Sequence, residues 1–360
     1  MDCIARVSGA PPKQTMRYPI GLVLDSVKHI AGNKLRGERR FPVMLSLDPL
    51  GGCGWHGVGN NGNGAASTER PLLTIEQCLE AMAECRTPIV SICGGEPLEY
   101  PEIGGLSRAI LERERHLFLC TNGALIRRRL HMIPPYTSFF WNVKLDGTRT
   151  VHDARNNSAG LFVEALDGVK AAKNAGFFVV INSTIYPDTD INDLAALYEQ
   201  LHALHVDGYF LLPHYPQQKL CCDGSAKFHA KMHQRFREAS EWLSDYNLMI
   251  SAIYLEYLRG ERELDCSVWG GPVYGPQGWS SPCSLLNVGY VKSYKALAEN
   301  TLWENYGRGL NPRCENCQCH EGYETAALLG MNPKAGDLWK LLAWQFGGSL
   351  GRKRQNGRKA

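Results

Sequence analysis

The sequence lacks several features that would place it at once in a broad class. No run of apolar residues approaches the length needed to span a bilayer. The formal net charge is only +3 over 360 residues, which is too small a basic excess to indicate nucleic acid as a partner. The first residues do not combine a basic stretch, an apolar run and a small-residue cleavage site, so we expect no export signal. These absences together predict a cytoplasmic location.

Cysteine, in contrast, is abundant. The chain has 13 cysteines, and 44% of its residues are hydrophobic. Without export to an oxidising compartment, the cysteines are expected to be reduced thiols that serve metal binding or catalysis rather than disulfides. The length and the apolar fraction suit one large domain, or one domain with a small appendage.

Short apolar runs alternate with longer amphipathic stretches from residue 41 to about residue 206. The predicted strands are residues 41–47, 89–92, 117–120, 139–144, 177–182 and 209–212, and the predicted helices are residues 74–83, 103–113, 161–175 and 190–204. Strands that take turns with helices pair in parallel through crossover connections. We therefore predict an α/β fold whose sheet curves into a full or partial barrel, with its site at the C-terminal ends of the strands.

Four segments are expected. Residues 1–40 contain a lead and an amphipathic helix over 19–34, residues 41–215 form the barrel core, and residues 216–330 form a Cys-rich C-terminal domain. Residues 331–360 contain an apolar helix over 338–346 and a basic tail. The first helix, with apolar Ile20, Leu22, Val23, Val27 and Ile30, is expected either to close the bottom of the barrel or to contact an anionic membrane surface. The last helix either caps the barrel or lies on a membrane, which would make the protein peripheral at the inner membrane.

Polar side chains gather where the predicted strands end. They are Cys53, Glu96, Thr121, Asn122, Lys144, Asp146, Asn182, Ser183 and His214. Asn, Asp and Gly are common at strand ends for backbone reasons alone, so each one taken singly is a turn residue. As a series on successive strand ends they favour a shared ligand.

Two stretches resemble motifs of the radical S-adenosylmethionine (SAM) family. Gly94-Gly95-Glu96-Pro97 is similar to the run that holds the amino end of SAM, and the glycine-rich loop that contains Cys53 stands in the place of the cluster loop. That family's loop reads Cys-x3-Cys-x2-Cys, whereas here Gly57 and Asn60 follow Cys53 at the second and third positions. Two of the three thiolates that would hold a [4Fe-4S] cluster are therefore replaced by residues that bind iron poorly. His56, Cys85, Cys93 and Cys120 are the substitutes that the sequence offers.

The resemblance also implies a fold and a cofactor site. It implies a partial (β/α)6 TIM-like barrel with a Cys-rich C-terminal extension. Asn122, Lys144 and Asp146 would contact the adenosyl and carboxylate parts of SAM, and Asn182 would reach the ribose. The Asp146-Gly147…His152-Asp153 run is similar to one whose histidine and aspartate shape a loop in this family, which we expect here too.

The C-terminal third resembles adenosylhopane synthases, radical SAM transferases of hopanoid biosynthesis. The similarity rests on Trp269-Gly270, Gly278-Trp279, Pro282-Cys283, the 301–307 run and the 314–324 run. It implies that a 5′-deoxyadenosyl radical adds to the alkene of diploptene, an apolar polycyclic hydrocarbon, with a ferredoxin or flavodoxin as electron donor. The product radical needs a hydrogen donor, for which Cys85 is the candidate, its alternative being a buried apolar role.

A second metal site is predicted from the tail cysteines. Cys314-x2-Cys317 has the spacing of half a site, and Cys266 and Cys283 could complete four thiolates for an auxiliary iron–sulfur cluster or zinc. Cys319 and His320 are further ligand candidates, and plain buried thiols are the alternative. Two functions stay open: an active radical SAM transferase, or a catalytically silent relative that binds or scaffolds.

Overall fold

The computed structural model describes residues 16–51, 71–216, 222–243, 245–286, 288–331 and 333–347. Within these ranges no helix is both long enough and apolar enough to cross a membrane.

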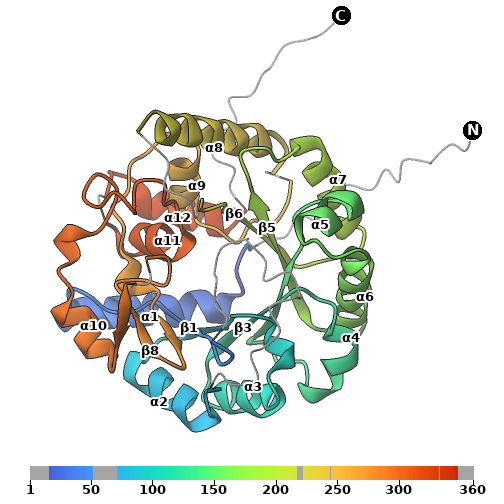
Figure 1. The fold of residues 1–360 in the computed structure, drawn as a ribbon, viewed down its shortest axis with the longest axis horizontal. Helices are drawn as coiled ribbons and strands as arrows, with labels where there is room; N and C mark the ends of the chain where they lie inside the picture. Colours follow the sequence, from blue (N-terminus) through green and yellow to red (C-terminus); the bar gives the residue numbers. More distant parts are fainter. Residues whose placement is uncertain are drawn as a thin grey trace, which may run out of the picture.

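Six parallel strands form the centre of the fold. They are β1 (Met44–Leu47), β2 (Ile89–Ile92), β3 (His116–Thr121), β4 (Phe139–Lys144), β5 (Phe178–Ile185) and β6 (Gly208–Pro213). The sheet order runs from β6 through β5, β4, β3 and β2 to β1, so consecutive strands are neighbours. Figure 1 shows the strands curving around a centre with the helices outside them, which confirms the predicted α/β partial barrel.

The crossover helices begin and end where local sequence signals place them. They are α2 (Ile75–Cys85), α3 (Ile103–Leu111), α4 (Ile126–Arg129), α5 (Arg149–Arg155), α6 (Leu161–Asn174) and α7 (Ile191–His202), followed by α8 (Cys222–Leu243). Thr74 and Gln77 exchange side chain-to-backbone hydrogen bonds in a capping box that starts α2. Asp190 accepts the backbone N–H groups that start α7.

The C-terminal region extends the same sheet. β7 (Val273–Gly275) pairs in parallel with β1, and β8 (Gly278–Ser281) and β9 (Gly289–Val291) follow it in antiparallel order. The helices of this region are α9 (Ala252–Leu258), α10 (Tyr294–Asn300), α11 (His320–Leu329) and α12 (Asp337–Gln345), with short 3₁₀ turns at Val268–Gly270 and Trp303–Asn305. The predicted Cys-rich segment therefore extends the barrel wall beyond β1 through β7.

Helix α11 bridges the two ends of the parallel sheet. The His320 ring contacts Phe210 of β6 and Tyr254 of α9, and α11 packs against the 3₁₀ turn whose Gly270 carbonyl accepts the Val43 N–H before β1. Figure 1 shows α9 and α11 in the space between β6 and the β8 hairpin. The barrel is thus closed by helices where its parallel strands do not meet.

The bottom of the barrel is apolar and closed by α1 (Ile20–Leu35). Phe118, Phe140, Val180 and Met249 form a buried cluster with Leu22 of α1. His116 Nε2 lies 3.0 Å from the carboxylate of Asp25, which ties the same helix to the start of β3. The barrel-closing interpretation of this helix is therefore confirmed.

Candidate functional site

Glu96 is fixed at the mouth of the barrel, just after β2. Its Oε1 accepts hydrogen bonds from the Thr121 hydroxyl (2.7 Å) and the Leu98 N–H (3.1 Å), and its Oε2 accepts the Asn122 N–H (2.9 Å). Burial raises the pKa of Glu96, while these donors act in the opposite direction. A carboxylate offers about four acceptor positions, so the three donors leave room for a further cation such as an ammonium.

The glycines before Glu96 bring two strand ends together. Gly94 has φ +84°, a conformation that favours glycine, and a Cβ at this position would overlap the Asp48 carboxylate that follows β1. Gly95 also has a positive φ, and Pro97 starts the short 3₁₀ turn Pro97–Glu99. The close approach at Gly94 is therefore to Asp48 of the same chain.

The polar series at the strand ends divides into turn residues and mouth residues. Asn122 accepts the Ala124 N–H at 3.0 Å, which makes it a turn residue through its side chain. Asp146 is buried, accepts the Thr184 N–H at 2.9 Å and lies 3.4 Å from Lys144 Nζ. Its carboxylate is therefore already engaged within the protein. Lys144 and Asn182 are register partners on β4 and β5, and both remain partly exposed.

His152 and Asp153 shape the loop after β4, as predicted. His152 is buried, and its Nδ1 accepts the Asp146 N–H. The Asp153 carboxylate accepts the N–H groups of Gly160 and Phe162 at the start of α6. Neither side chain is placed for acid–base chemistry at the mouth.

The thiol inside the barrel belongs to Cys120, not to Cys85. Cys120 Sγ lies 3.3 Å from Ser91 Oγ and accepts the Asn142 amide at 3.2 Å. Burial, with nearby Cys93, raises the pKa of Cys120 to about 12, so it stays a protonated thiol at neutral pH. Cys85 lies instead in the hydrophobic core between α2 and the outer face of the sheet.

The prediction of Cys85 as hydrogen donor therefore does not fit its location. The alternation of side chains along β3 indicates the direction of Cys120. Cys120 lies two residues after Phe118, which belongs to the buried cluster at the bottom of the barrel, so both side chains face the barrel interior.

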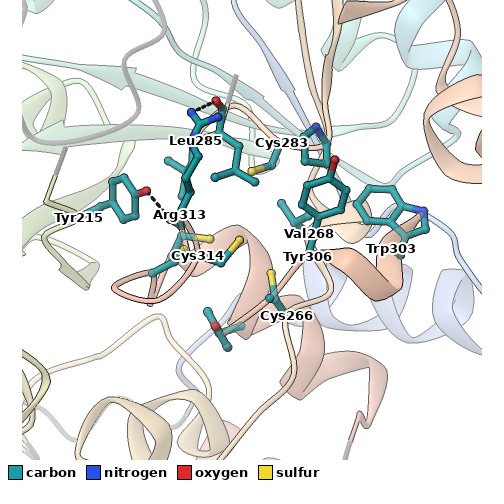
Figure 2. A pocket seen from close by; sticks show the side chains of 15 residues that line it. Tyr215, Cys266, Val268, Cys283, Leu285, Trp303, Tyr306, Arg313 and Cys314 are labelled. Atoms are coloured by element: carbon teal, nitrogen blue, oxygen red, sulfur yellow. Dashed lines mark hydrogen bonds between the residues drawn. The ribbon is translucent and has the colours of Figure 1, made fainter. Parts of the chain in front are cut away.

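The tail cysteines line one apolar pocket. Cys266, Cys283, Cys314, Cys317 and Cys319 surround it, together with aromatic and aliphatic side chains such as Trp303, Tyr306 and Leu285. Figure 2 shows the thiols of Cys266, Cys283 and Cys314 directed toward the space between them. The structure thus brings together all four predicted ligands and Cys319. In the described ranges, no group of three or more His, Cys, Asp or Glu side chains is arranged to hold a single metal ion.

Comparison with known proteins identifies the barrel. Residues 59–201 match the model of the radical SAM superfamily. The chain carries a radical SAM domain. Residues 213–341 match a domain of unknown function, DUF3463. The radical SAM superfamily consists generally of enzymes, and it implies SAM and a [4Fe-4S] cluster as cofactors.

Relatives of this radical SAM domain match only part of the chain. The chain is 25% identical over 179 residues to an AdoMet-dependent heme synthase of Methanosarcina barkeri, covering 48% of this chain and 51% of that protein. It is 27% identical over 110 residues to a pre-heme d1 synthase of Dinoroseobacter shibae, covering 30% of this chain and 27% of that protein. The chain therefore spans about half the length of the first relative and less of the second.

Solved structures share the fold. SuiB of Streptococcus suis, bound to the precursor peptide SuiA, aligns with a TM-score of 0.59 and 16% identity, covering 77% of this chain and 69% of SuiB. At this level of identity the likeness concerns the fold alone.

The residues of the radical SAM domain fit one implied cofactor better than the other. Glu96, held at the mouth with an acceptor position to spare, suits the ammonium of SAM. The cluster loop does not supply the expected three thiolates, because Gly57 and Asn60 stand where cysteines would be needed. Cys53, His56, Gly57 and Asn60 lie outside the described residues, so their arrangement stays a prediction.

Proposed function

We propose that this chain is a radical SAM transferase that joins the 5′-deoxyadenosyl group of SAM to the alkene of an apolar polycyclic hydrocarbon. The resemblance of the sequence to adenosylhopane synthases implies diploptene as that hydrocarbon. One observation carries the proposal. At the end of β3, Thr121 holds Glu96, while the adjacent residue Cys120 presents a half-buried, protonated thiol to the barrel interior. A carboxylate that would anchor SAM and a thiol that would donate hydrogen are thus both held at the C-terminal end of β3.

The roles of the side chains follow from this geometry. Glu96 would bind the SAM ammonium, with Thr121 and the Asn122 N–H fixing the direction of its carboxylate. The [4Fe-4S] cluster of the family, when bound, supplies the electron for SAM cleavage. The aromatic barrel bottom around Phe118 and Phe140 would keep water away from the reacting carbon.

Cys120 would complete the addition. Once the deoxyadenosyl carbon has bonded to the alkene, the neighbouring carbon holds an unpaired electron. The Cys120 S–H bond breaks, its hydrogen atom goes to that carbon, and a thiyl radical remains on sulfur. One electron from a ferredoxin or flavodoxin and one proton from solvent then restore the thiol. Ser91 and Asn142 hold the sulfur in place for this transfer.

For the tail pocket we propose an auxiliary iron–sulfur cluster bound by Cys266, Cys283, Cys314 and Cys317, with Cys319 as the fifth thiol. The apolar lining and the number of thiols support a soft-ligand site.

The second function, a catalytically silent relative that binds or scaffolds, is favoured by a specific observation as well. A cluster held by Cys53 without thiolates at Gly57 and Asn60 would be labile. In that case the barrel and the tail cluster would remain while SAM cleavage was lost.

Anaerobic reconstitution with iron and sulfide distinguishes these functions. We would count iron and assay 5′-deoxyadenosine and the adenosylated hydrocarbon for the wild type, Cys53→Ala, the pair Cys314→Ser and Cys317→Ser, and the control Cys78→Ser, whose thiol is buried on α2. The transferase predicts iron loss in both the Cys53 and the tail variants, and deoxyadenosine from the wild type. Iron that depends on the tail pair alone, with no deoxyadenosine, would leave only the silent relative.

A further inference from the structure

Helix α12 exposes large apolar side chains on one face while it buries Trp344 on the other. Its inner face contacts α9 and its surroundings through Trp344, whose Nε1 donates to the Ile250 carbonyl at 2.7 Å, and through the ion pairs Asp337–Arg262 and Lys340–Glu256. Its outer face carries large apolar side chains, among which Trp339 is 77% exposed and Leu338 is 69% exposed. Leu342 and Phe346 continue this row. A helix that only covered the fold would show the opposite pattern.

Helix α1 repeats this arrangement. Leu22 enters the barrel-bottom cluster, whereas Ile20, Leu24, Val27 and Leu35 are exposed. The first three are spaced by four and three residues, so they share one side of the helix. Ile20 and Val27 therefore do not share the side of α1 on which Leu22 faces the barrel.

The two rows meet at one junction. The Arg17 N–H donates to the Gln345 carbonyl and its Nε donates to the Trp344 carbonyl, both at 2.9 Å. Gln345 Nε2 donates to the Tyr18 carbonyl at 2.7 Å. The start of α1 is thereby fastened to the end of α12.

We call the eight exposed apolar residues of α1 and α12 the docking face. They are Ile20, Leu24, Val27, Leu35, Leu338, Trp339, Leu342 and Phe346. Of the 15 large hydrophobic residues that the described chain leaves exposed, eight lie here, so the exposure is concentrated rather than scattered.

Basic residues cluster at the end of the docking face that contains Leu35. Lys28 and Lys34 lie on α1, and Arg36, Arg39 and Arg40 follow its end together with a single acidic residue, Glu38, all exposed. The acidic side chains of the two helices have internal partners, Asp25 with His116 and Asp337 with Arg262. The surroundings of the docking face are therefore complementary to a negatively charged partner.

We propose that the docking face binds the surface of an anionic lipid bilayer. Exposed Trp, Leu and Phe side chains enter the boundary between headgroups and acyl chains, and neighbouring Lys and Arg residues attract anionic headgroups. Because α1 closes the bottom of the barrel, this contact would hold the protein by its closed end and leave the Glu96 mouth accessible. The proposal does not depend on the catalytic assignment.

Co-sedimentation of the full chain with lipid vesicles tests whether the docking face binds an anionic bilayer. We expect binding to vesicles that contain phosphatidylglycerol, weak binding to pure phosphatidylcholine vesicles, and release by high salt. The double variant Trp339→Gln with Leu342→Gln, and separately Leu24→Gln with Val27→Gln, should each weaken binding roughly tenfold or more, because each removes two inserting side chains. These positions are exposed, so melting temperatures should stay close to that of the wild type.

The matched control is Leu72→Gln with Val163→Gln, which replaces two apolar residues that are each 42% exposed elsewhere. The control should bind like the wild type. The proposal is overturned if the wild type ignores anionic vesicles, if it binds both vesicle types equally, or if the docking-face variants bind normally. It is also overturned if ultracentrifugation without lipid shows a dimer that Trp339→Gln dissociates, since a second copy would then cover the face.

Discussion

Replacement of Glu324 by glutamine should stabilise the protein at alkaline pH and leave it nearly unchanged at acidic pH. Glu324 lies in α11 and is buried, and its carboxylate accepts hydrogen bonds at 2.9 Å from both the N–H and the hydroxyl of Ser251. Burial raises the pKa of Glu324 to about 7, against the opposing effect of these two donors. The folded protein therefore binds this proton more tightly than the unfolded chain does.

The sign and size of the effect follow from this pKa. An acid whose pKa is raised by folding contributes its stability below its ordinary pKa, near 4.5, and loses that stability as the pH rises through about 7. The loss at pH 8 corresponds to about 3 kcal/mol of unfolding free energy. Glutamine can keep both contacts, since its oxygen accepts the Ser251 N–H and its amide donates to the hydroxyl, but it carries no charge at any pH.

Thermal melting of Glu324→Gln and of the wild type at pH 5 and pH 8 measures this pH-dependent difference in stability. The variant should melt several degrees higher than the wild type at pH 8 and at nearly the same temperature at pH 5. Burial also raises the pKa of Glu321, to about 8, but this residue is common to both proteins and cancels in the comparison. The exposed Glu112→Gln serves as the control. The reasoning is refuted if the difference between variant and wild type is the same at both pH values.

Three further predictions concern the barrel. Cys120→Ala should abolish the adenosylated product in a chromatographic assay while 5′-deoxyadenosine is still formed. Cys85→Ala should still form both compounds. The reverse result would assign the role of hydrogen donor to Cys85. Thr121→Val should weaken SAM binding roughly tenfold or more in calorimetry, since it removes a hydrogen bond to a carboxylate; unchanged affinity would separate this contact from SAM. Gly94→Ala should lower the melting temperature because its Cβ overlaps Asp48, and adding Asp48→Ala should recover part of the loss; no destabilisation by the first change would contradict the packing.

The alternation of strands and helices was visible in the sequence because buried parallel strands are short apolar runs and their crossover helices are amphipathic. The function of the Gly94–Pro97 run was indicated only by its resemblance to the radical SAM motif, together with the acceptor that Glu96 supplies. The strand β7 was not predicted. It has only three residues, and its parallel pairing with β1 joins positions more than 200 residues apart, for which local sequence carries no signal.

The direction in which a side chain points was harder to predict than the position of a helix or strand. The sequence did not show where the thiol of Cys85 points, and the structure places it in the core beside α2, whereas Cys120 faces the barrel interior. In α1, apolar residues occupy two sides of the helix, so hydrophobicity alone could not separate Leu22, which enters the barrel, from Val27, which does not. The tail cysteines were easier, because their number and spacing indicated a shared site before the pocket was known.

The central claim is that Glu96 holds SAM at the mouth of a barrel that can still cleave it. The most direct test is 5′-deoxyadenosine formation from SAM by anaerobically reconstituted protein under a strong reductant. We predict formation by the wild type, at least about tenfold less by Glu96→Ala because an ammonium loses its carboxylate, and wild-type rates for Glu99→Ala, an exposed neighbour in the same turn. No deoxyadenosine from the wild type, or equal amounts from Glu96→Ala, would contradict the account.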